Sequence, residues 1–317
     1  MRIVLFGGTG QLGGFLTRWL RREGHTVQIV GRSQTDPLLR WDGRSDGPWM
    51  NLVDGADAVI NLAGRTVNCR YNWRNLNEMM QSRVDSCEAV GRAIERAKAP
   101  PPVWIQASTA TIYAHHFGEA FDEKNGVIGG KEQEVPDYWA YSVAIARAWE
   151  FALYAANTPQ TRKVAIRTGF TMSPDKGGVF DMLAGLAKVG LGGPLAGGKQ
   201  YISWIGDEDF VGAILHCIEE DRLEGPVNFT TPHPVTNRDF MGELAKATGQ
   251  RLTFPIAKWM AWLGCIFLRT DIELMLKSRR VVPGKLLETG FVFTQARWER
   301  VCGPMVERWK TGKVLAA

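Results

Sequence analysis

The sequence predicts an α/β fold, a doubly wound parallel sheet with a smaller C-terminal domain. Apolar runs of strand length, separated by segments long enough for helices, recur at residues 2–6, 26–30, 56–63, 103–108 and 163–168. Alternating strand and helix signals are typical of a parallel sheet that helices cover on both faces. Beyond about residue 170 the pattern changes to glycine-rich loops and short helices. We therefore expect a sheet domain at residues 1–170 and a smaller substrate domain at 171–317, with residues 204–228 returning to the sheet domain.

The first connecting segment carries a clear helix signal. Its apolar side chains recur at the spacing of one helix face: Leu12, Phe15, Leu16, Trp19 and Leu20. Arg18, Arg21 and Arg22 lie off this stripe. A period near 3.6 residues is typical of an amphipathic helix. We expect this helix to pack on the sheet.

Composition excludes several classes of protein. With 317 residues, 45% of them apolar and 22% charged, the chain can bury a full core and is unlike a disordered sequence. The five cysteines are far apart and form no Cys-x-x-Cys pair, so neither a disulfide framework nor a zinc site is indicated. We expect no metal, and a reducing, cytoplasmic location. The net charge of +5 is spread in short clusters, so we expect no nucleic-acid partner.

Two apolar stretches bear on membranes and subunits. The opening "MRIVLFGG" has four apolar residues before glycine and predicts a buried strand rather than a signal peptide. The longest apolar run, "WMAWLGCIFL" at residues 259–268, is half the ~20 residues that cross a bilayer. We expect no membrane association. The run should be buried in the second domain or form a subunit contact in a homodimer.

A glycine-rich stretch joins the first strand to the first helix. In "LFGGTGQLGG", Gly7, Gly10 and Gly13 are spaced G-x-x-G-x-x-G. Glycine allows a tight turn, lets the backbone approach a pyrophosphate, and leaves amide groups at the positive end of a helix. This context predicts a Rossmann-type dinucleotide site, against the alternative of a glycine turn without a ligand. The candidate cofactor residues in this stretch are Gly7, Thr9, Gly10, Gln11, Leu12 and Gly13.

The end of the second strand indicates which dinucleotide binds. A site specific for NAD usually presents Asp or Glu to the ribose hydroxyls, whereas this chain has Gly31, Arg32 and Ser33. A guanidinium and a hydroxyl suit a 2'-phosphate, so the sequence favours NADP(H) over NAD. The alternative is that Arg32 is a solvated loop residue.

Several longer motifs carry a family resemblance. They are "GGTGQLGG", "ADAVINLAGRTVN", "ASTATIY", "RAWE", the glycine-rich block from "RTGFTMSPDKGG" to "KQYISWI", and "PVTNRDFMGELAKATG". The chain resembles the extended short-chain dehydrogenase/reductase superfamily, and within it an atypical branch of nucleotide-sugar epimerase-like proteins with unassigned substrate. The matching segments span residues 5 to about 250, and "RRVVPGKLLETGFVF" extends the likeness.

The resemblance implies further cofactor contacts. It places Asn61, Leu62, Ala63 and Gly64 along the cofactor after a fourth strand, and Asp42 near the adenine. Ser108 would lie at the end of the fifth strand. Each of these is also a plausible strand-end or turn residue, Asp42 above all.

The resemblance also locates the catalytic residues. In "ASTATIY", Thr109 matches the catalytic Ser or Thr of the superfamily, and Tyr113 follows four residues later. The Tyr-x-x-x-Lys pair of the superfamily falls on Ser142 and Ala146, so both members are missing, as is general in this branch. Tyr141 is one residue away and could enter through a small change of register. A tyrosine without a lysine is only about one part in a thousand ionised at pH 7, so it is a poor base but a possible acid.

A loop of the second domain is the expected substrate contact. "GLGGPLAGGKQYISWI" resembles the segment with which extended superfamily members hold the nucleotide part of their substrate, and its candidates are Gln200, Ser203 and Trp204. The alternative is an interdomain hinge with a core tryptophan.

Two functions therefore stay open. One is an NADP(H)-dependent oxidoreductase or epimerase-like enzyme acting on a polar, nucleotide-linked or other small-molecule substrate, with Thr109, Tyr113 and Tyr141 as catalytic candidates. The other is a non-catalytic NADP(H)-binding protein that reports redox state to a partner. The elaborate second-domain loop favours the enzyme, because cofactor sensing alone does not explain it.

Overall fold

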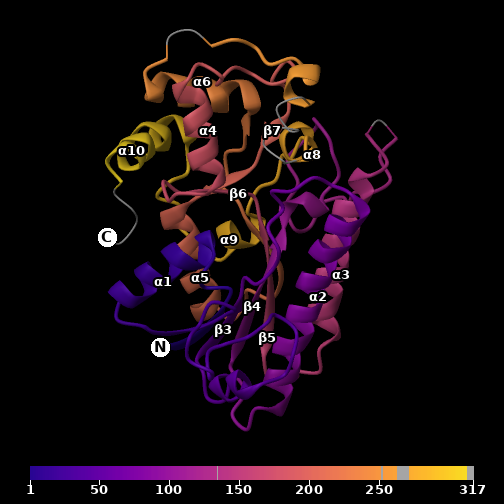
Figure 1. Cartoon of the computed structure of the whole chain (residues 1–317), viewed down its shortest axis with the longest axis vertical. Coiled ribbons are helices and arrows are strands. Elements are labelled where there is room, and N and C mark those ends of the chain that lie inside the picture. Colours follow the sequence, from indigo (N-terminus) through magenta and orange to yellow (C-terminus); the bar gives the residue numbers. More distant parts are fainter. Residues whose placement is uncertain (134, 251–252, 263–270, 313–317) are drawn as a thin grey trace.

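A parallel sheet forms the centre of the protein in the computed structural model, which describes residues 1–133, 135–250, 253–262 and 271–312. Within these residues six parallel strands follow the order β2-β1-β3-β4-β5-β9 (Figure 1). They are β1 (Arg2–Phe6), β2 (Thr26–Val30), β3 (Ala58–Asn61), β4 (Val103–Thr109), β5 (Arg162–Thr168) and β9 (Gly225–Phe229). Their carboxyl ends therefore meet at one edge of the sheet, where ligands bind in open α/β folds.

Helices cover both faces of this sheet, which confirms the predicted doubly wound α/β class. One face carries α1 (Gln11–Arg22) and α5 (Asp207–Glu219), whose apolar side chains join the strands in one core cluster. The other face carries α2 (Trp73–Arg96) and α3 (Trp139–Ala155). In α1 the predicted stripe faces inward, with Phe15, Leu16 and Leu20 fully buried.

The connection between β2 and β3 differs from the pattern of the superfamily. That pattern places Asn61 after a fourth strand and Thr109 after a fifth, whereas they end the third and fourth strands of this chain. The segment 31–57 is rich in Gly, Asp and Pro and lacks an apolar run of strand length. Its contribution to the sheet is a single parallel bridge between Gly31 and Arg40, followed by a short 3-10 helix, Pro48–Leu52.

A second unit lies beyond the carboxyl edge of the sheet (Figure 1). The helices α4 (Val179–Lys188), α6 (Asn237–Thr248) and α10 (Trp298–Thr311) share a separate core cluster. Short pairs of strands join this unit: β6 (Phe170–Met172) with β8 (Trp204–Gly206), and β7 (Tyr201–Ile202) with β10 (Val235–Thr236). Two short helices, α8 (Glu273–Leu276) and α9 (Gly284–Glu288), precede α10 in the chain. A further 3-10 turn, Ala110–Ile112, follows β4.

The apolar run at 259–268 was expected to be buried in the second domain or to form a subunit contact, and the structure contradicts the first alternative while the second stays a prediction. Trp259 is 65% exposed and Trp262 is 58% exposed, so this part of the run is not buried in the second domain. Residues 263–268 lie outside the described part of the chain.

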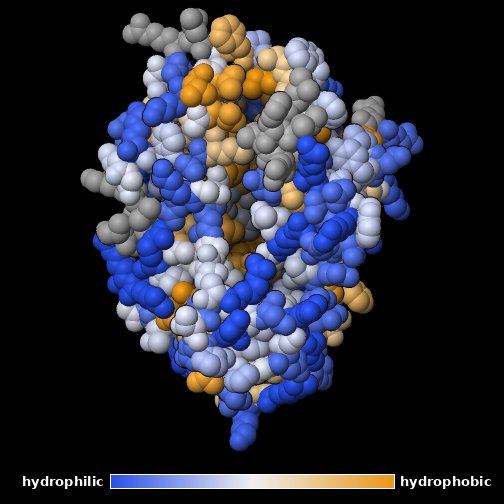
Figure 2. Space-filling model, viewed as in Figure 1, coloured by the Kyte–Doolittle hydropathy of each residue, from blue (hydrophilic) through white to orange (hydrophobic). Residues whose placement is uncertain are grey.

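In the space-filling view, apolar side chains gather at the top of one face, and the surface is hollowed near its centre (Figure 2). No helix of the described residues is both long and apolar enough to span a bilayer.

Candidate functional site

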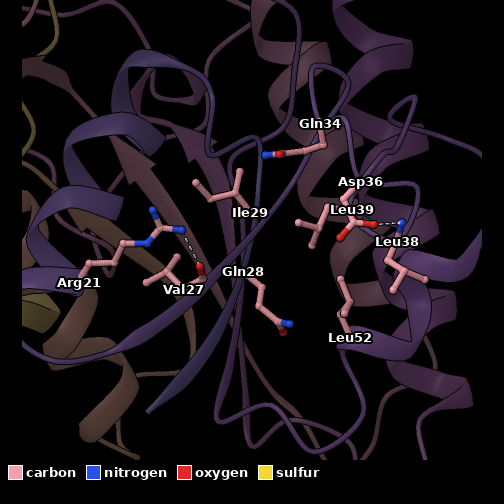
Figure 3. A pocket seen from close by; sticks show the side chains of 9 residues that line it. All are labelled: Arg21, Val27, Gln28, Ile29, Gln34, Asp36, Leu38, Leu39 and Leu52. Atoms are coloured by element: carbon pink, nitrogen blue, oxygen red, sulfur yellow. Dashed lines mark hydrogen bonds between the residues drawn. The ribbon is translucent and has the colours of Figure 1, made fainter.

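Two surface hollows lie away from the glycine-rich stretch. One, of about 400 Å³, runs along the edge strand β2 and is lined by Gln28, Ile29 and Leu39 among others (Figure 3). The other, of about 490 Å³, lies on the outer side of α3 beside Arg147 and Phe151. The first hollow includes no carboxyl end of a central strand, and the second reaches only Arg167 near the end of β5. The candidate site is therefore built from its residues instead.

The glycine-rich stretch forms a tight turn between β1 and α1. Gly7 has a φ of 77°, a conformation that side chains other than glycine rarely adopt. A Cβ on Gly13 would meet the Gly7 carbonyl oxygen at 2.7 Å. The glycines at positions 7 and 13 are therefore required by backbone geometry. Gly10, in contrast, is exposed at the tip, where its nearest neighbour to a Cβ would be the Gly7 oxygen at 3.4 Å.

The beginning of α1 fits a negatively charged group. Its N-cap is Gly10, no side chain of the described residues caps it, and no acidic residue stands in its first turn. The first amide groups of a helix have no partner inside the helix, and its N-terminus carries partial positive charge. Gln11 lies beside them with a buried Nε2 that has no hydrogen-bond partner among the described residues. These free donors are what a pyrophosphate would satisfy.

The chain after β3 passes directly over the glycine turn. Asn61 is buried, and its Oδ1 accepts a hydrogen bond from the Ala63 amide at 3.0 Å. A Cβ on Gly7 would meet the Ala63 nitrogen at 2.8 Å and the Leu62 carbonyl carbon at 2.9 Å. The structure therefore brings the predicted residues of β1 and β3 together, with Gly64 exposed just beyond them. Leu12 is turned the other way, against the core of the sheet.

The end of β2 completes this surface. Arg32 and Ser33 are both exposed, directly after the last strand residue and its buried neighbour Gly31. A Cβ on Gly31 would lie 3.8 Å from the Thr9 hydroxyl, so the glycine turn and the end of β2 are adjacent. The Arg32 guanidinium can therefore reach a ligand that lies over Thr9 and Gly10.

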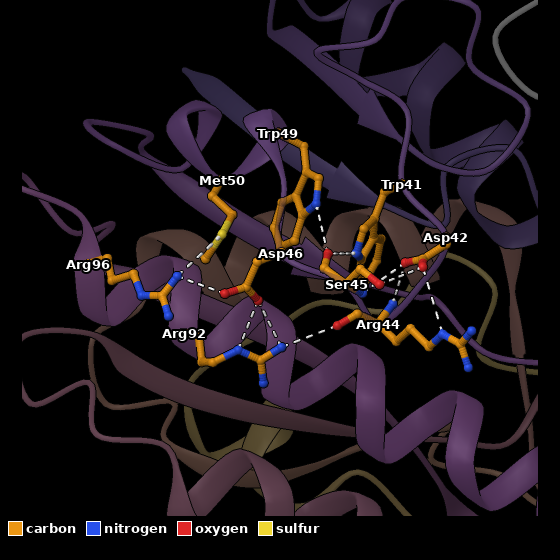
Figure 4. A network of polar contacts seen from close by, with 9 residues as sticks. All are labelled: Trp41, Asp42, Arg44, Ser45, Asp46, Trp49, Met50, Arg92 and Arg96. Atoms are coloured by element: carbon orange, nitrogen blue, oxygen red, sulfur yellow. Dashed lines mark hydrogen bonds and ion pairs between the residues drawn. The ribbon is translucent and has the colours of Figure 1, made fainter.

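Asp42 has a structural role of its own. Its carboxylate accepts hydrogen bonds from the amides of Arg44, at 2.9 Å, and Ser45, at 2.8 Å, and from the Ser45 hydroxyl at 2.7 Å (Figure 4). Slight burial opposes ionisation, but these hydrogen bonds lower the pKa of Asp42. Such contacts are typical of an Asx turn. Both carboxylate oxygens of Asp42 are thus engaged in hydrogen bonds within the turn itself.

A buried polar network lies at the carboxyl end of β4. Ser108 donates to Glu150 at 2.7 Å, and Glu150 receives both Nε and Nη2 of Arg167 at 2.8 Å. Arg167 also donates from Nη1 to the Tyr113 hydroxyl at 2.9 Å, and that hydroxyl donates to Asn228 Oδ1 at 2.9 Å. Sequence reasoning did not single out Glu150 as an ion-pair partner or Arg167 at all. The sequence offers little to predict this ion pair, because Glu150 lies on a helix and Arg167 on a strand and no local motif links the two.

This network encloses Tyr113. The side chain is 1% exposed, and burial raises its pKa although Arg167 opposes the shift. Its hydroxyl is therefore held inside the protein. Thr109 lies at the carboxyl end of β4, is half-buried, and accepts a hydrogen bond from the Thr111 amide at 3.1 Å.

On α3, the position of the missing tyrosine faces inward. Ser142 is buried and its hydroxyl donates to Glu273 Oε2 at 2.6 Å. Tyr141, one residue earlier, is 37% exposed on the helix surface. Tyr138 is also exposed and its hydroxyl lies 3.3 Å from Asp271; partial burial, together with the Asp271 charge, raises its pKa to about 12. On α3, the inward-facing position that the superfamily gives to its tyrosine is therefore held by Ser142. Tyr141 points to the helix surface instead.

Glu273 and Lys277, which sequence reasoning missed, contact Ser142 and the turn after Thr109 and so join the candidate site. Both side chains are almost fully buried, and the Lys277 amine lies 3.9 Å from Glu273 Oε1 and donates to the Thr111 carbonyl at 2.9 Å. Burial lowers the pKa of Lys277 to about 8, and the neighbouring Arg279 acts in the same direction. Burial raises the pKa of Glu273, against the hydrogen bond from Ser142. Their spacing of four residues was the available signal, because it places two charges on one helix face.

The predicted substrate residues of the second unit are turned inward. The Gln200 amide donates to the Leu195 carbonyl at 3.2 Å, and the Ser203 hydroxyl donates to the Arg279 carbonyl at 2.8 Å. Trp204 is fully buried, with its ring 5.0 Å from that of Trp298 in an edge-on arrangement. The loop thus positions the segment around Arg279, and the tryptophan belongs to the core of the second unit.

Comparisons with known proteins agree with this arrangement. The model of the NAD dependent epimerase/dehydratase family matches residues 3–229. Epimerase family protein SDR39U1 from Homo sapiens is 29% identical over 299 residues, which are 93% of this chain and 96% of the human protein.

Solved structures show the same architecture. The crystal structure of human SDR39U1 (isoform 2) with NADPH has a TM-score of 0.82 at 26% identity, covering 97% of this chain and 99% of that one. A nucleoside-diphosphate sugar epimerase from Corynebacterium glutamicum has a TM-score of 0.75 at 25% identity, covering 100% of this chain and 59% of that one. These matches confirm the resemblance drawn from the sequence motifs.

Proposed function

Because the chain belongs to the NAD dependent epimerase/dehydratase family, we propose that it is an NADP(H)-dependent oxidoreductase or epimerase-like enzyme. Its substrate is polar and binds between the carboxyl edge of the sheet and the second unit. The cofactor supplies hydride transfer when bound. The observation that carries the proposal is the uncapped N-terminus of α1 below the glycine turn, with the unpartnered Gln11 amide beside it.

The choice of NADP(H) rests on the end of β2. Arg32 and Ser33 are exposed next to Thr9, and a guanidinium pairs with a 2'-phosphate through charge-assisted hydrogen bonds. Human SDR39U1, which was crystallised with NADPH, supports the same choice.

Proton transfer in this site cannot use a Tyr-x-x-x-Lys pair, because Ser142 and Ala146 hold those positions. We assign to Thr109 the orientation of the reacting oxygen. Of the two tyrosines that the sequence suggests, Tyr113 is enclosed and Tyr141 lies on the helix surface. Lys277 is as enclosed as Tyr113, but it is a further candidate acid, because its amine bonds to the turn that follows Thr109 and a pKa of about 8 leaves it mostly protonated at pH 7.

A non-catalytic NADP(H)-binding protein is the second candidate. The enclosed hydroxyl of Tyr113 and the inward-facing Ser142 favour it, because neither offers a proton to a ligand in the present arrangement. Against it stands the buried pair Glu273 and Lys277, two titratable groups for which cofactor binding alone gives no reason.

The test has two steps. Calorimetric titration should first show that the protein binds NADPH. The NADPH-loaded protein is then mixed with nucleotide sugars, sugar phosphates and 2-keto acids in turn, while the absorbance of the reduced nicotinamide is followed. Consumption of NADPH with one class identifies an oxidoreductase, and isomerised product without net consumption identifies an epimerase. Binding without either reaction would support the non-catalytic protein, and absence of NADPH binding would reject both.

A further inference from the structure

Arg279 presents an unfilled hydrogen-bonding edge inside the protein. Its side chain is 7% exposed. Nη1 donates to the carbonyl oxygens of Leu274, at 3.2 Å, and Lys277, at 3.4 Å. Nε and Nη2 are both buried and have no partner among the residues that the structure describes. These two atoms form one edge of the guanidinium, with two parallel N–H groups spaced to match a carboxylate or a phosphoryl group.

Arg167 shows how the same edge is filled elsewhere in this chain. There Nε and Nη2 donate to the two oxygens of Glu150, each at 2.8 Å, and Nη1 binds the Tyr113 hydroxyl. Both arginines are buried, but only the edge of Arg167 has an anion in the described structure. A buried guanidinium edge without an acceptor is unfavourable, because its N–H groups have left water without replacement. An anionic ligand would supply that acceptor.

The surroundings of Arg279 add charge and a hydrogen-bond acceptor. Lys277, 2% exposed, contributes a second buried cation two residues before Arg279, and burial lowers the pKa of both groups. Glu273 Oε1, 3.9 Å from the Lys277 amine, has no hydrogen-bond partner within the described residues. The ring of Phe170 lies 5.8 Å from the guanidinium carbon. The segment thus offers a donor edge, an ammonium and a carboxylate oxygen together.

This segment lies between the two halves of the site. The Arg279 amide donates to the Tyr201 carbonyl at 2.9 Å, which ties it to the second unit. Lys277 binds the Thr111 carbonyl, two residues after Thr109 at the edge of the sheet. A group held by Arg279 would therefore lie in the region where the proposed substrate meets the cofactor domain.

We propose that the Nε and Nη2 edge of Arg279 binds an anionic group of the substrate, a carboxylate or a phosphoryl group. Lys277 adds positive charge, and Glu273 Oε1 accepts a hydrogen bond from a hydroxyl of the same molecule. The substrate class is thus a hydroxylated acid or a sugar phosphate. The inference rests on the proposed function, because only an enzyme has a substrate. The binding of an anion to Arg279 can nevertheless be measured without turnover.

The test compares matched small molecules. Inorganic phosphate, glycerate and glycerol are titrated calorimetrically into the full chain, with and without NADPH; glycerol matches glycerate but lacks its charge. We expect phosphate or glycerate to bind and glycerol not to bind, and the stronger of the two anions identifies the group. Arg279→Lys keeps the positive charge but removes the two parallel N–H groups of the guanidinium edge. It should weaken that binding by at least about tenfold. The control Arg297→Gln, at a half-exposed arginine on another element, should leave binding unchanged.

A measurement on the unchanged protein guards against a variant that does not fold. The Arg279 Nε–H signal, followed by nitrogen NMR, should shift on addition of the anion. No shift with either anion, or equal binding by a folded Arg279→Lys protein, would overturn the inference. Binding of NADPH is scored separately: if NADPH binds and no anion reaches Arg279, this inference fails alone. If an anion binds Arg279 and NADPH does not bind, the proposed function fails instead.

Discussion

At the scale of single residues, we propose that Arg32 selects NADP(H) over NAD. Its exposed guanidinium stands at the end of β2, beside Thr9. We expect NADPH to bind more tightly than NADH, and Arg32→Ala to remove much of the difference, about 1.5 to 3 kcal/mol or ten- to a hundredfold in affinity. Calorimetry with both cofactors measures this. Arg22→Ala, at the opposite end of α1, is the control. Equal dissociation constants in the parent protein would contradict the assignment.

Tyr113 provides a prediction about stability. Its hydroxyl joins Arg167 to Asn228 in the buried network, so Tyr113→Phe leaves a buried guanidinium N–H and an amide oxygen short of a partner. We expect the free energy of unfolding to fall by about 1–3 kcal/mol. Tyr141→Phe, at a side chain 37% exposed, should change it by less than about 0.5 kcal/mol. Urea unfolding of the two variants measures the contrast, and equal small losses would mean that the network does not stabilise the fold.

At the scale of elements, the turn into α1 offers a matched pair of glycines. A Cβ at Gly13 would meet Gly7 oxygen at 2.7 Å, whereas at Gly14 the nearest atom would be Arg18 Nη1 at 3.7 Å. Gly13→Ala should destabilise the protein by about 1–3 kcal/mol through overpacking and weaken NADPH binding. Gly14→Ala should stabilise it by up to about 1 kcal/mol, since alanine is the better helix former. Unfolding curves and cofactor titrations of both variants test this; similar behaviour of the two would contradict the close packing at Gly13.

The elements also show what sequence could and could not predict. Five of the six described strands of the sheet and α1 were predictable because each follows from a local pattern of apolar residues, whereas β9 was not predicted. The glycine turn was predictable from its spacing between a strand and a helix. The contact of Ser142 with Glu273 spans 131 positions, so no local pattern announces it. The reduced strand near Arg40 was missed for a similar reason, and hydrophobicity alone could not choose between burial and a subunit contact for Trp259, because neither family pattern nor hydrophobicity reports the tertiary neighbours of a segment.

At the scale of the whole molecule, the segment that follows α8 links the two halves of the protein. Lys277 binds the turn after β4, and the Arg280 carbonyl accepts a hydrogen bond from the Phe121 amide at 2.8 Å. The Ser203 hydroxyl holds the backbone of the same segment from the second unit. The charged groups of the site thus depend on contacts between distant parts of the chain, and their protonation should be coupled to the stability of the whole fold.

Lys277 makes this coupling measurable. The groups that face it are Glu273, Glu132, Arg279 and His115. Burial lowers its pKa from 10.5 to about 8, so between these pH values the unfolded chain binds more protons than the folded one. By linkage, this residue makes the folded state more stable as the pH rises through that window, by up to about 1.4 kcal/mol per pH unit. Lys277→Met should remove that contribution.

The comparison needs unfolding free energies of the parent and of Lys277→Met at pH 8, 9 and 10. Buried thiols and tyrosines titrate in the same range, and their raised pKa values act in the opposite direction, because the folded state then retains protons that the unfolded state loses. They are common to both proteins and cancel in the difference. The parent should therefore gain stability with pH relative to Lys277→Met, by about 2–3 kcal/mol in total, while Lys98→Met at an exposed position follows the parent. Parallel curves for the parent and Lys277→Met would mean that the ammonium keeps an ordinary pKa and that the segment admits water.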